Sequence, residues 1–198
     1  MIFVTSNKNK AKEIVDIANN SRMENKISIM EPELYKQIGE IEEIQNVDVK
    51  IVACDKVKKI YDAVIKLNNN KKDKIYIVCE DTGLYLQDGL MHGFPGAYIK
   101  DFFDYIGNDI CKIHPNGMAI AKTAMAVYDG QNINVFVGEI TGTIAKEPDF
   151  SEKSFGFDNC FIPFNNNITF SKMSEQEKNN ISMRKDALEK LFYWFNNK

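Results

Sequence analysis

Residues 75–83, IYIVCEDTG, place two acids directly after an apolar run. Residues 75–79 have the β-branched and aromatic composition of a buried strand. Glu80 and Asp81 follow at once, and Thr82-Gly83 predicts a turn after them. Adjacent carboxylates repel each other, and burial increases the repulsion. The sequence therefore predicts a strand that ends at a cation or at a site of chemistry.

The rest of the chain alternates strand and helix patterns before a hairpin. The expected strands are 2–4, 26–30 and 75–79, and the expected helices are 9–18, 48–67 and 97–106. Two alternating segments, 123–128 and 135–145, flank a turn at Asp129-Gly130 and predict the hairpin. Ser174, with Glu177 three residues later, forms a capping box, and Ser182 begins a final helix. This order predicts an α/β fold with a mixed sheet and helices around it.

Length and composition limit the class of protein. The 198 residues predict a single domain, 1–198, and a net charge of −3 provides no basic field for long nucleic acid. No apolar run reaches 18 residues and no secretory signal pattern opens the chain, so we expect no membrane segment. The 4 cysteines lie far apart without a CxxC pair, which favours buried, reduced thiols and a cytoplasmic location.

The first strand leads into a polar turn before a helix. The turn contains Thr5, Ser6, Asn7, Lys8, Asn9 and Lys10. Free N–H groups at a helix start, together with lysines, form an anion site. An ordinary capped turn with solvated lysines is the alternative, and the GxxxxGK[ST] phosphate loop is absent from the sequence.

A second acidic stretch precedes the helix at 48–67. Glu40, Glu42 and Glu43 there are either partners of the helix dipole, solvated charges, or functional acids. Lys56 lies beside the apolar face of that helix. Its amine either reaches the edge of the core or points into a cleft toward an anion.

Three further segments carry polar groups near apolar ones. A Gly-Phe-Pro-Gly-Ala turn precedes the helix that carries Lys100. Asp158 stands among phenylalanines, which form either core or a slot that stacks a base. Lys178 and Arg184 lie six positions apart, so a helix break near 179–182 is needed for both to reach one cleft.

Several of these motifs occur in a recognisable order. They are Thr5-Ser6-Asn7-Lys8-Asn9-Lys10, Glu43-Ile44-Gln45, Lys56, Glu80-Asp81-Thr82-Gly83-Leu84, Pro95-Gly96-Ala97-Tyr98 with Lys100, Phe155-Gly156-Phe157-Asp158-Asn159-Cys160-Phe161, and Glu177-Lys178-Asn179 with Ser182-Met183-Arg184. Over nearly the whole chain they resemble the inosine triphosphate pyrophosphatase family. Ser6, Phe157, Asn159 and Met183 depart from the Gly, the Trp or Tyr, the Pro and the His of that family.

The resemblance implies a fold and a reaction. The fold would be an elongated mixed β-sheet flanked by helices, with two lobes and a central nucleotide cleft. The enzyme would hydrolyse ITP, dITP and XTP to the monophosphate and pyrophosphate, and would form a homodimer. Glu43 and Asp81 would hold Mg²⁺, with Mn²⁺ as the alternative, and Glu80 would support them. Asp81 would also activate water, while Lys10, Lys56 and Lys178 would clamp phosphates.

The resemblance also implies the substrate contacts. They fall on Thr5, Ser6, Asn7, Lys8, Asn9, Lys10, Lys56, Asp81, Thr82, Lys100, Phe155, Gly156, Phe157, Asp158, Lys178, Met183 and Arg184. Two alternatives stay open: a related pyrophosphatase with another base preference, and a nucleotide-binding protein without catalysis. Retention of Glu43, Asp81 and the lysines argues against the second.

Met183 raises a question about base selectivity. The family His can donate a hydrogen bond to a 6-oxo purine, whereas a thioether is a weak acceptor. We therefore expect some loss of discrimination against ATP. The alternative is that this side chain only packs.

Overall fold

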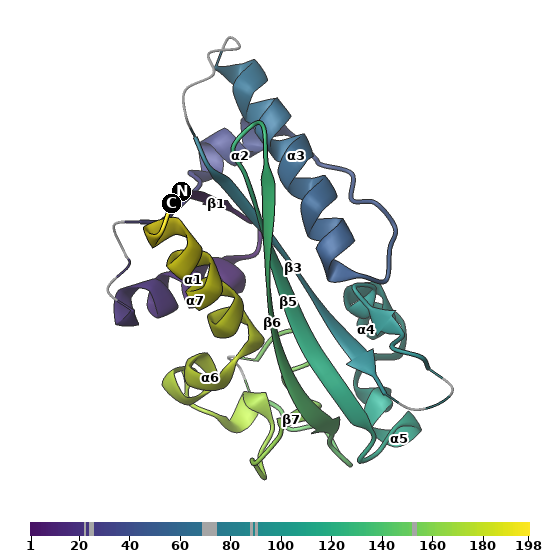
Figure 1. Ribbon diagram of the computed structural model, residues 1–198. Coiled ribbons are helices and arrows are strands. Elements are labelled where there is room, and N and C mark those ends of the chain that lie inside the picture. The colour runs from purple at the N-terminus through teal and green to yellow at the C-terminus, as the bar shows by residue number, and fades with distance from the viewer. Residues whose placement is uncertain (22, 24–25, 69–74, 88, 90, 152–153) are drawn as a thin grey trace.

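A long mixed sheet runs through the computed structural model, which describes residues 1–198 except 22, 24–25, 69–74, 88, 90 and 152–153 (Figure 1). Its strands are β1 (Ile2–Val4), β2 (Ser28–Ile29), β3 (Ile77–Leu86), β4 (Pro95–Gly96), β5 (Met118–Tyr128), β6 (Ile133–Ile144) and β7 (Phe161–Pro163). The strand order is β2-β1-β3-β5-β6-β7, with β4 beside β3. β1 is parallel to β2 and β3, and the other pairs are antiparallel. The mixed sheet predicted from the sequence is confirmed.

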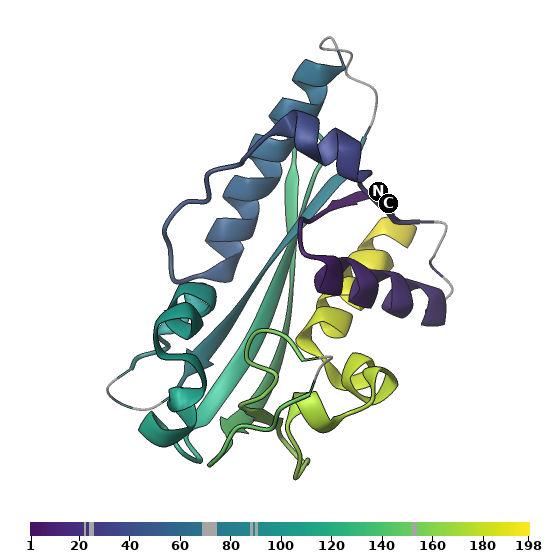
Figure 2. The same ribbon diagram turned by 180° about the vertical axis from the view of Figure 1, so that it is seen from behind.

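Helices cover both faces of the sheet. They are α1 (Lys8–Asn20), α2 (Pro32–Ile38), α3 (Val49–Leu67), α4 (Ile99–Ile106), α5 (Ile110–Ile113), α6 (Glu175–Ile181) and α7 (Met183–Asn196), with 3₁₀ turns at Gly107–Asp109 and Phe170–Lys172. α3 lies on one face and α1 and α7 lie on the other, as the two opposite views show (Figures 1 and 2). Within the described ranges, no helix combines the length and apolarity needed to span a bilayer.

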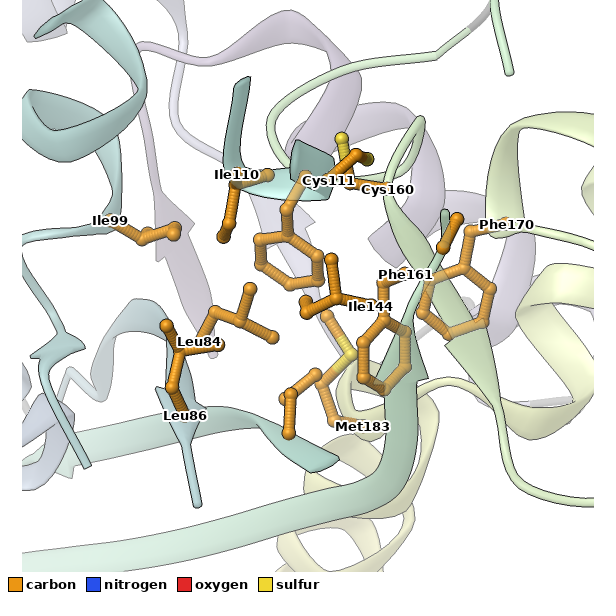
Figure 3. Packing of buried hydrophobic residues seen from close by; sticks show 14 residues of the cluster. Leu84, Leu86, Ile99, Ile110, Cys111, Ile144, Cys160, Phe161, Phe170 and Met183 are labelled. Carbon is orange, nitrogen blue, oxygen red and sulfur yellow. The ribbon is translucent and has the colours of Figure 1, made fainter. Parts of the chain in front are cut away.

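Apolar clusters fill the space between these layers. One lies between α3 and the sheet, and a second lies between the sheet and the pair α1 and α7. A third cluster gathers where β3 and β5 meet α4, α5 and β7, and it includes Leu84, Ile110, Phe161 and Met183 (Figure 3). Cys79, Cys111 and Cys160 are buried free thiols, as expected, whereas Cys54 is half-buried.

Local capping signals begin the helices where the sequence predicted them. The Asn7 carboxamide accepts hydrogen bonds from the first turn of α1. Ser174 forms its capping box with Glu177, and Ser182 caps α7. Asp129 accepts two backbone hydrogen bonds in the loop between β5 and β6, which confirms the hairpin.

The predicted end of the strand at residue 79 is wrong. β3 continues through both acids to Leu86, and its register with β5 is unbroken. Gly83 is not in a turn; it is needed because a Cβ there would lie 2.6 Å from the carbonyl carbon of Gly96 in β4. The sequence patterns also missed α2, α5 and β7, which are short elements held by tertiary contacts.

Candidate active site

Glu80 and Asp81 occupy neighbouring positions in β3 and therefore point to opposite faces of the sheet. Glu80 faces α1 and α7, where Lys10 and Arg184 contact it. Asp81 faces α3, on the side where Cys79 joins the α3 cluster. Because side chains alternate along β3, these two carboxylates lie on opposite faces of the sheet although they are adjacent in sequence. Each carboxylate therefore has different neighbours.

Glu80 is a buried and fully paired carboxylate. Arg184 donates to it from Nε at 2.8 Å and from Nη2 at 3.1 Å, and Lys10 Nζ lies 2.9 Å away. Burial alone would raise the pKa of Glu80, but the charges of Arg184 and Lys10 outweigh burial and hold the pKa well below its ordinary value. Glu80 is therefore ionised across the physiological range and anchors the two cations.

Asp81 has the opposite character. Its Oδ2 is buried and has no hydrogen-bond partner within the described part of the chain. Burial raises the pKa of Asp81 to about 6, although the charges of Lys10 and Lys56 oppose the change. A carboxylate with a free oxygen and a pKa near neutrality can accept a proton or bind a cation.

Glu43 approaches the same face from an irregular segment, residues 39–48, between α2 and α3. Its carboxylate forms an ion pair with Lys56 of α3, and its charge contributes to the raised pKa of Asp81. Burial lowers the pKa of Lys56, but the hydrogen bond and the charge of Glu43 raise it above the ordinary value overall. Lys59 Nζ donates to the Glu42 carbonyl at 2.7 Å and holds the segment to α3.

These two carboxylates are the groups that could hold a divalent metal. Mg²⁺ binds through one or two carboxylates and keeps its other positions for phosphates and water. Glu43, Asp81 and the unpartnered Oδ2 match that preference. Among the described residues, no group of three or more His, Cys, Asp and Glu side chains could form a larger metal site. Two carboxylates of this kind are compatible with a Mg²⁺ site that takes its other ligands from phosphates and water.

The first turn of α1 lies beside Glu80. The Thr5 hydroxyl accepts from the Asn7 N–H at 3.1 Å, and the polar residues Ser6, Asn7, Lys8 and Asn9 are exposed. Lys10 Nζ bonds Glu80 on one side of the sheet, and its charge also acts on Asp81. Asn7 Oδ1 accepts from the N–H groups of Asn9 and Lys10, so the helix start is a capped turn, which was the alternative to an anion site. Binding of phosphate by this turn stays a prediction.

A cavity of about 170 Å³ opens on the α1 face. Its lining includes Asn9, Glu13, Phe155, Asp158 and Lys178. Lys178 Nζ lies 4.4 Å from the centre of the Phe155 ring, 2.6 Å from Asp158 Oδ2 and 2.8 Å from Glu13 Oε1. An aromatic ring beside a buried ion pair can stack a planar base and bond its polar edge.

Glu13 connects the cavity to Glu80. It pairs with Lys178 at the cavity and with Arg184 on its other oxygen. A continuous line of ion pairs runs from Asp158 through Lys178, Glu13, Arg184 and Glu80 to Lys10. Sequence reasoning missed Glu13, although an acid three positions after Lys10 and next to a buried Ile14 was a usable signal.

The predicted break between α6 and α7 is confirmed. Ser182 has an extended backbone, with φ −72° and ψ 150°, which separates the two helices. Lys178 and Arg184 consequently reach the same carboxylate, Glu13. Lys178 is held between Glu13 and Asp158 and lies at the cavity, and its expected contact with a phosphate stays a prediction.

The remaining predicted contacts take different positions. Phe157 and Met183 are buried in the third apolar cluster, and neither lines the cavity. Gly156 is exposed at φ +62°, and Lys100 is exposed in α4. Thr82 bonds Thr123 and Arg184 on the Glu80 face. Met183 thus occupies a packing position.

Comparison with known proteins places this arrangement in a family. A dITP/XTP pyrophosphatase of Pyrobaculum aerophilum is 32% identical over 162 residues, covering 77% of this chain and 85% of the relative. An inosine triphosphate pyrophosphatase of Saccharomyces cerevisiae is 32% identical over 193 residues, covering 94% and 91%. The fold matches a HAM1 protein from Coxiella burnetii with a TM-score of 0.76 at 19% identity, covering 100% and 98%. Residues 1–194 match the Ham1 family, to which this chain belongs.

Proposed function

We propose that this protein hydrolyses the non-canonical purine nucleoside triphosphates ITP, dITP and XTP to monophosphate and pyrophosphate, and so clears them from the nucleotide pool. Its relatives carry the names dITP/XTP pyrophosphatase and inosine triphosphate pyrophosphatase. The observation that carries the proposal is Asp81, whose buried Oδ2 has no hydrogen-bond partner among the described residues while the charges of Lys10, Lys56 and Glu43 act on its pKa.

In this proposal Asp81 positions the attacking water and takes its proton. The water oxygen bonds to the α-phosphorus, the bond from that phosphorus to the bridging oxygen breaks, and pyrophosphate leaves. Lys10 and Lys56 stabilise the negative oxygens as point charges. The raised pKa of Asp81, about 6, still leaves the carboxylate ionised at neutral pH, so it can act as a base.

Glu43 and Asp81 would hold Mg²⁺, or Mn²⁺ as the alternative. The fit rests on their shared face, their electrostatic coupling and the free Oδ2. When bound, the ion would neutralise part of the triphosphate charge. Lys56, which pairs with Glu43, would then be available to a phosphate oxygen.

The cavity beside Phe155 is the proposed base site. Phe155 would stack the purine, and the Lys178–Asp158 pair would meet its polar edge. An ammonium donor favours a 6-oxo acceptor over the 6-amino group of adenine. This supports the substrate class named for the relatives.

Product analysis tests the reaction. ITP with Mg²⁺ should give IMP and pyrophosphate, and EDTA should abolish turnover. Formation of IDP and orthophosphate would show that the attack is at another phosphorus. A protein that binds ITP without turnover would favour the non-catalytic alternative, and a panel of triphosphates decides the base preference. The homodimer and the cytoplasmic location stay predictions.

A further inference from the structure

The segment that carries Glu43 contains no helix or strand. α2 ends at Ile38 and α3 begins at Val49, so no helix or strand hydrogen bonds position Glu43. Its position depends on the contacts that its segment makes with neighbouring elements. A metal ligand must be held to within a fraction of an ångström to be effective. The groups that hold this segment therefore bear directly on the metal site proposed above.

The Tyr85 hydroxyl lies at the junction of this segment and α3. It donates to the Val47 carbonyl at 3.0 Å and accepts from the Val49 N–H at 3.0 Å. The Val49 N–H belongs to the first residue of α3 and has no acceptor within the helix, while Asp48 caps the next N–H, that of Lys50. One hydroxyl thus joins the end of the Glu43 segment to the start of the helix that carries Lys56.

Close packing fixes the tyrosine itself. The Val47 carbonyl also accepts at 2.9 Å from the N–H of Ala97, the residue that follows β4. Gly96 permits this approach, because a Cβ there would lie 2.3 Å from the Val47 oxygen and 3.1 Å from the Tyr85 ring. Lys122 Nζ lies 5.3 Å from the centre of the ring and pairs with Glu139 across the β5–β6 ladder.

Tyr85 and Asp81 stand on the same strand and the same face, four positions apart. The strand therefore sets the distance between the acid and the anchor, roughly 13 Å along the backbone. The anchor fixes the end of the Glu43 segment at Val47 and the start of α3 at Val49, while Lys59 holds the same segment at the Glu42 carbonyl.

We infer that Tyr85 is a positioning residue for the divalent metal site. Its hydroxyl holds Glu43 and Lys56 in the correct position relative to Asp81. This inference rests on the proposed function, since it assumes that Glu43 and Asp81 bind the ion. Tyr85 touches neither carboxylate in its hydrogen bonds, so its effect passes through the backbone of Val47 and Val49.

The test compares Tyr85→Phe with Tyr61→Phe. Tyr61 lies on α3, and its hydroxyl donates to the Asp129 carbonyl at 3.5 Å, so the control also removes one hydroxyl that links α3 to a loop. Mn²⁺ binding is followed by the EPR signal of the free ion, and amide hydrogen exchange of residues 39–48 is followed in metal-free protein. Tyr85→Phe should weaken Mn²⁺ binding about tenfold, as for other groups that orient metal ligands. It should also speed exchange in that segment, whereas Tyr61→Phe should change neither.

Glu43→Gln distinguishes a failure of the proposed metal site from a failure of the inference about Tyr85. If Glu43→Gln binds Mn²⁺ as tightly as wild type, the metal site is wrong and the inference falls with it. If Glu43→Gln weakens binding but Tyr85→Phe stays within twofold of wild type, only the inference is overturned. Equal effects of Tyr85→Phe and Tyr61→Phe on binding and exchange would also overturn it.

Discussion

Asp81→Asn should remove activity and at the same time stabilise the metal-free protein. Asp81 Oδ2 is buried and unpartnered among the described residues, and burial raises the pKa of this carboxyl from an ordinary 3.8 to about 6. At pH 7.5 the folded, metal-free protein must therefore keep a charge in surroundings that disfavour it. Asn has the shape of the protonated carboxyl but carries no charge, so the variant avoids this penalty.

The magnitude follows from the difference between the two pKa values. Each pH unit corresponds to about 1.4 kcal/mol, so the difference of roughly two units gives about 3 kcal/mol in favour of Asp81→Asn at pH 7.5. Because the folded pKa is the higher one, the penalty is fully present above pH 6 and relieved as the pH falls toward 3.8. At pH 4.5 the advantage of the variant should shrink to about 1 kcal/mol.

Urea unfolding in EDTA at pH 7.5 and pH 4.5 measures both quantities. Asp62→Asn, an exposed substitution on α3, is the matched control and should stay within about 0.5 kcal/mol of wild type at each pH. Initial rates with ITP and Mg²⁺ should show a fall in kcat of roughly 10²- to 10⁴-fold for Asp81→Asn. An Asp81→Asn protein that is less stable than wild type at pH 7.5, or equally stabilised at both pH values, would refute the electrostatic reasoning.

Three further substitutions test the packing and the ion pairs. Leu84→Ala removes a fully buried side chain and should lower the free energy of unfolding by about 2–5 kcal/mol, with little change in kcat per folded molecule. Glu13→Gln leaves Lys178 and Arg184 without their shared carboxylate and should cost about 3 kcal/mol in urea unfolding; a neutral result would mean that Asp158 and Glu80 alone compensate the two buried cations. Met183→His places a polar ring in an apolar cluster, so it should destabilise the fold by about 1–3 kcal/mol and leave the ratio of kcat/KM for ITP and ATP unchanged. A rise in that ratio would instead support base recognition at this position.

Sequence patterns that span only a few residues were sufficient to predict many of the helices and turns. The Ser174 capping box and the turn at Asp129-Gly130 each act through bonds that span two or three residues. The apolar periodicity of α3 likewise depends only on the helix itself. These elements formed where the sequence predicted them because no distant partner is needed to specify them.

Other features depended on partners far along the chain. The acids at 80 and 81 looked like the end of a strand, because two charges rarely occupy a buried strand without compensation. Arg184 supplies that compensation for Glu80 from 104 positions away. The role of Glu13 and the anchoring by Tyr85 were equally hidden, since each depends on which helix packs against which face.

The order of residues specifies which acids, lysines and aromatic side chains the chain carries, and hence which chemistry is available to it. The packing of helices on the sheet gives these groups separate roles. Alternation along β3 turns Glu80 toward α7 as a paired structural anchor and Asp81 toward α3 as a free acid. A carboxylate takes its pKa from the charges and the solvent around it, and those surroundings exist only once the helices have packed on the two faces of the sheet.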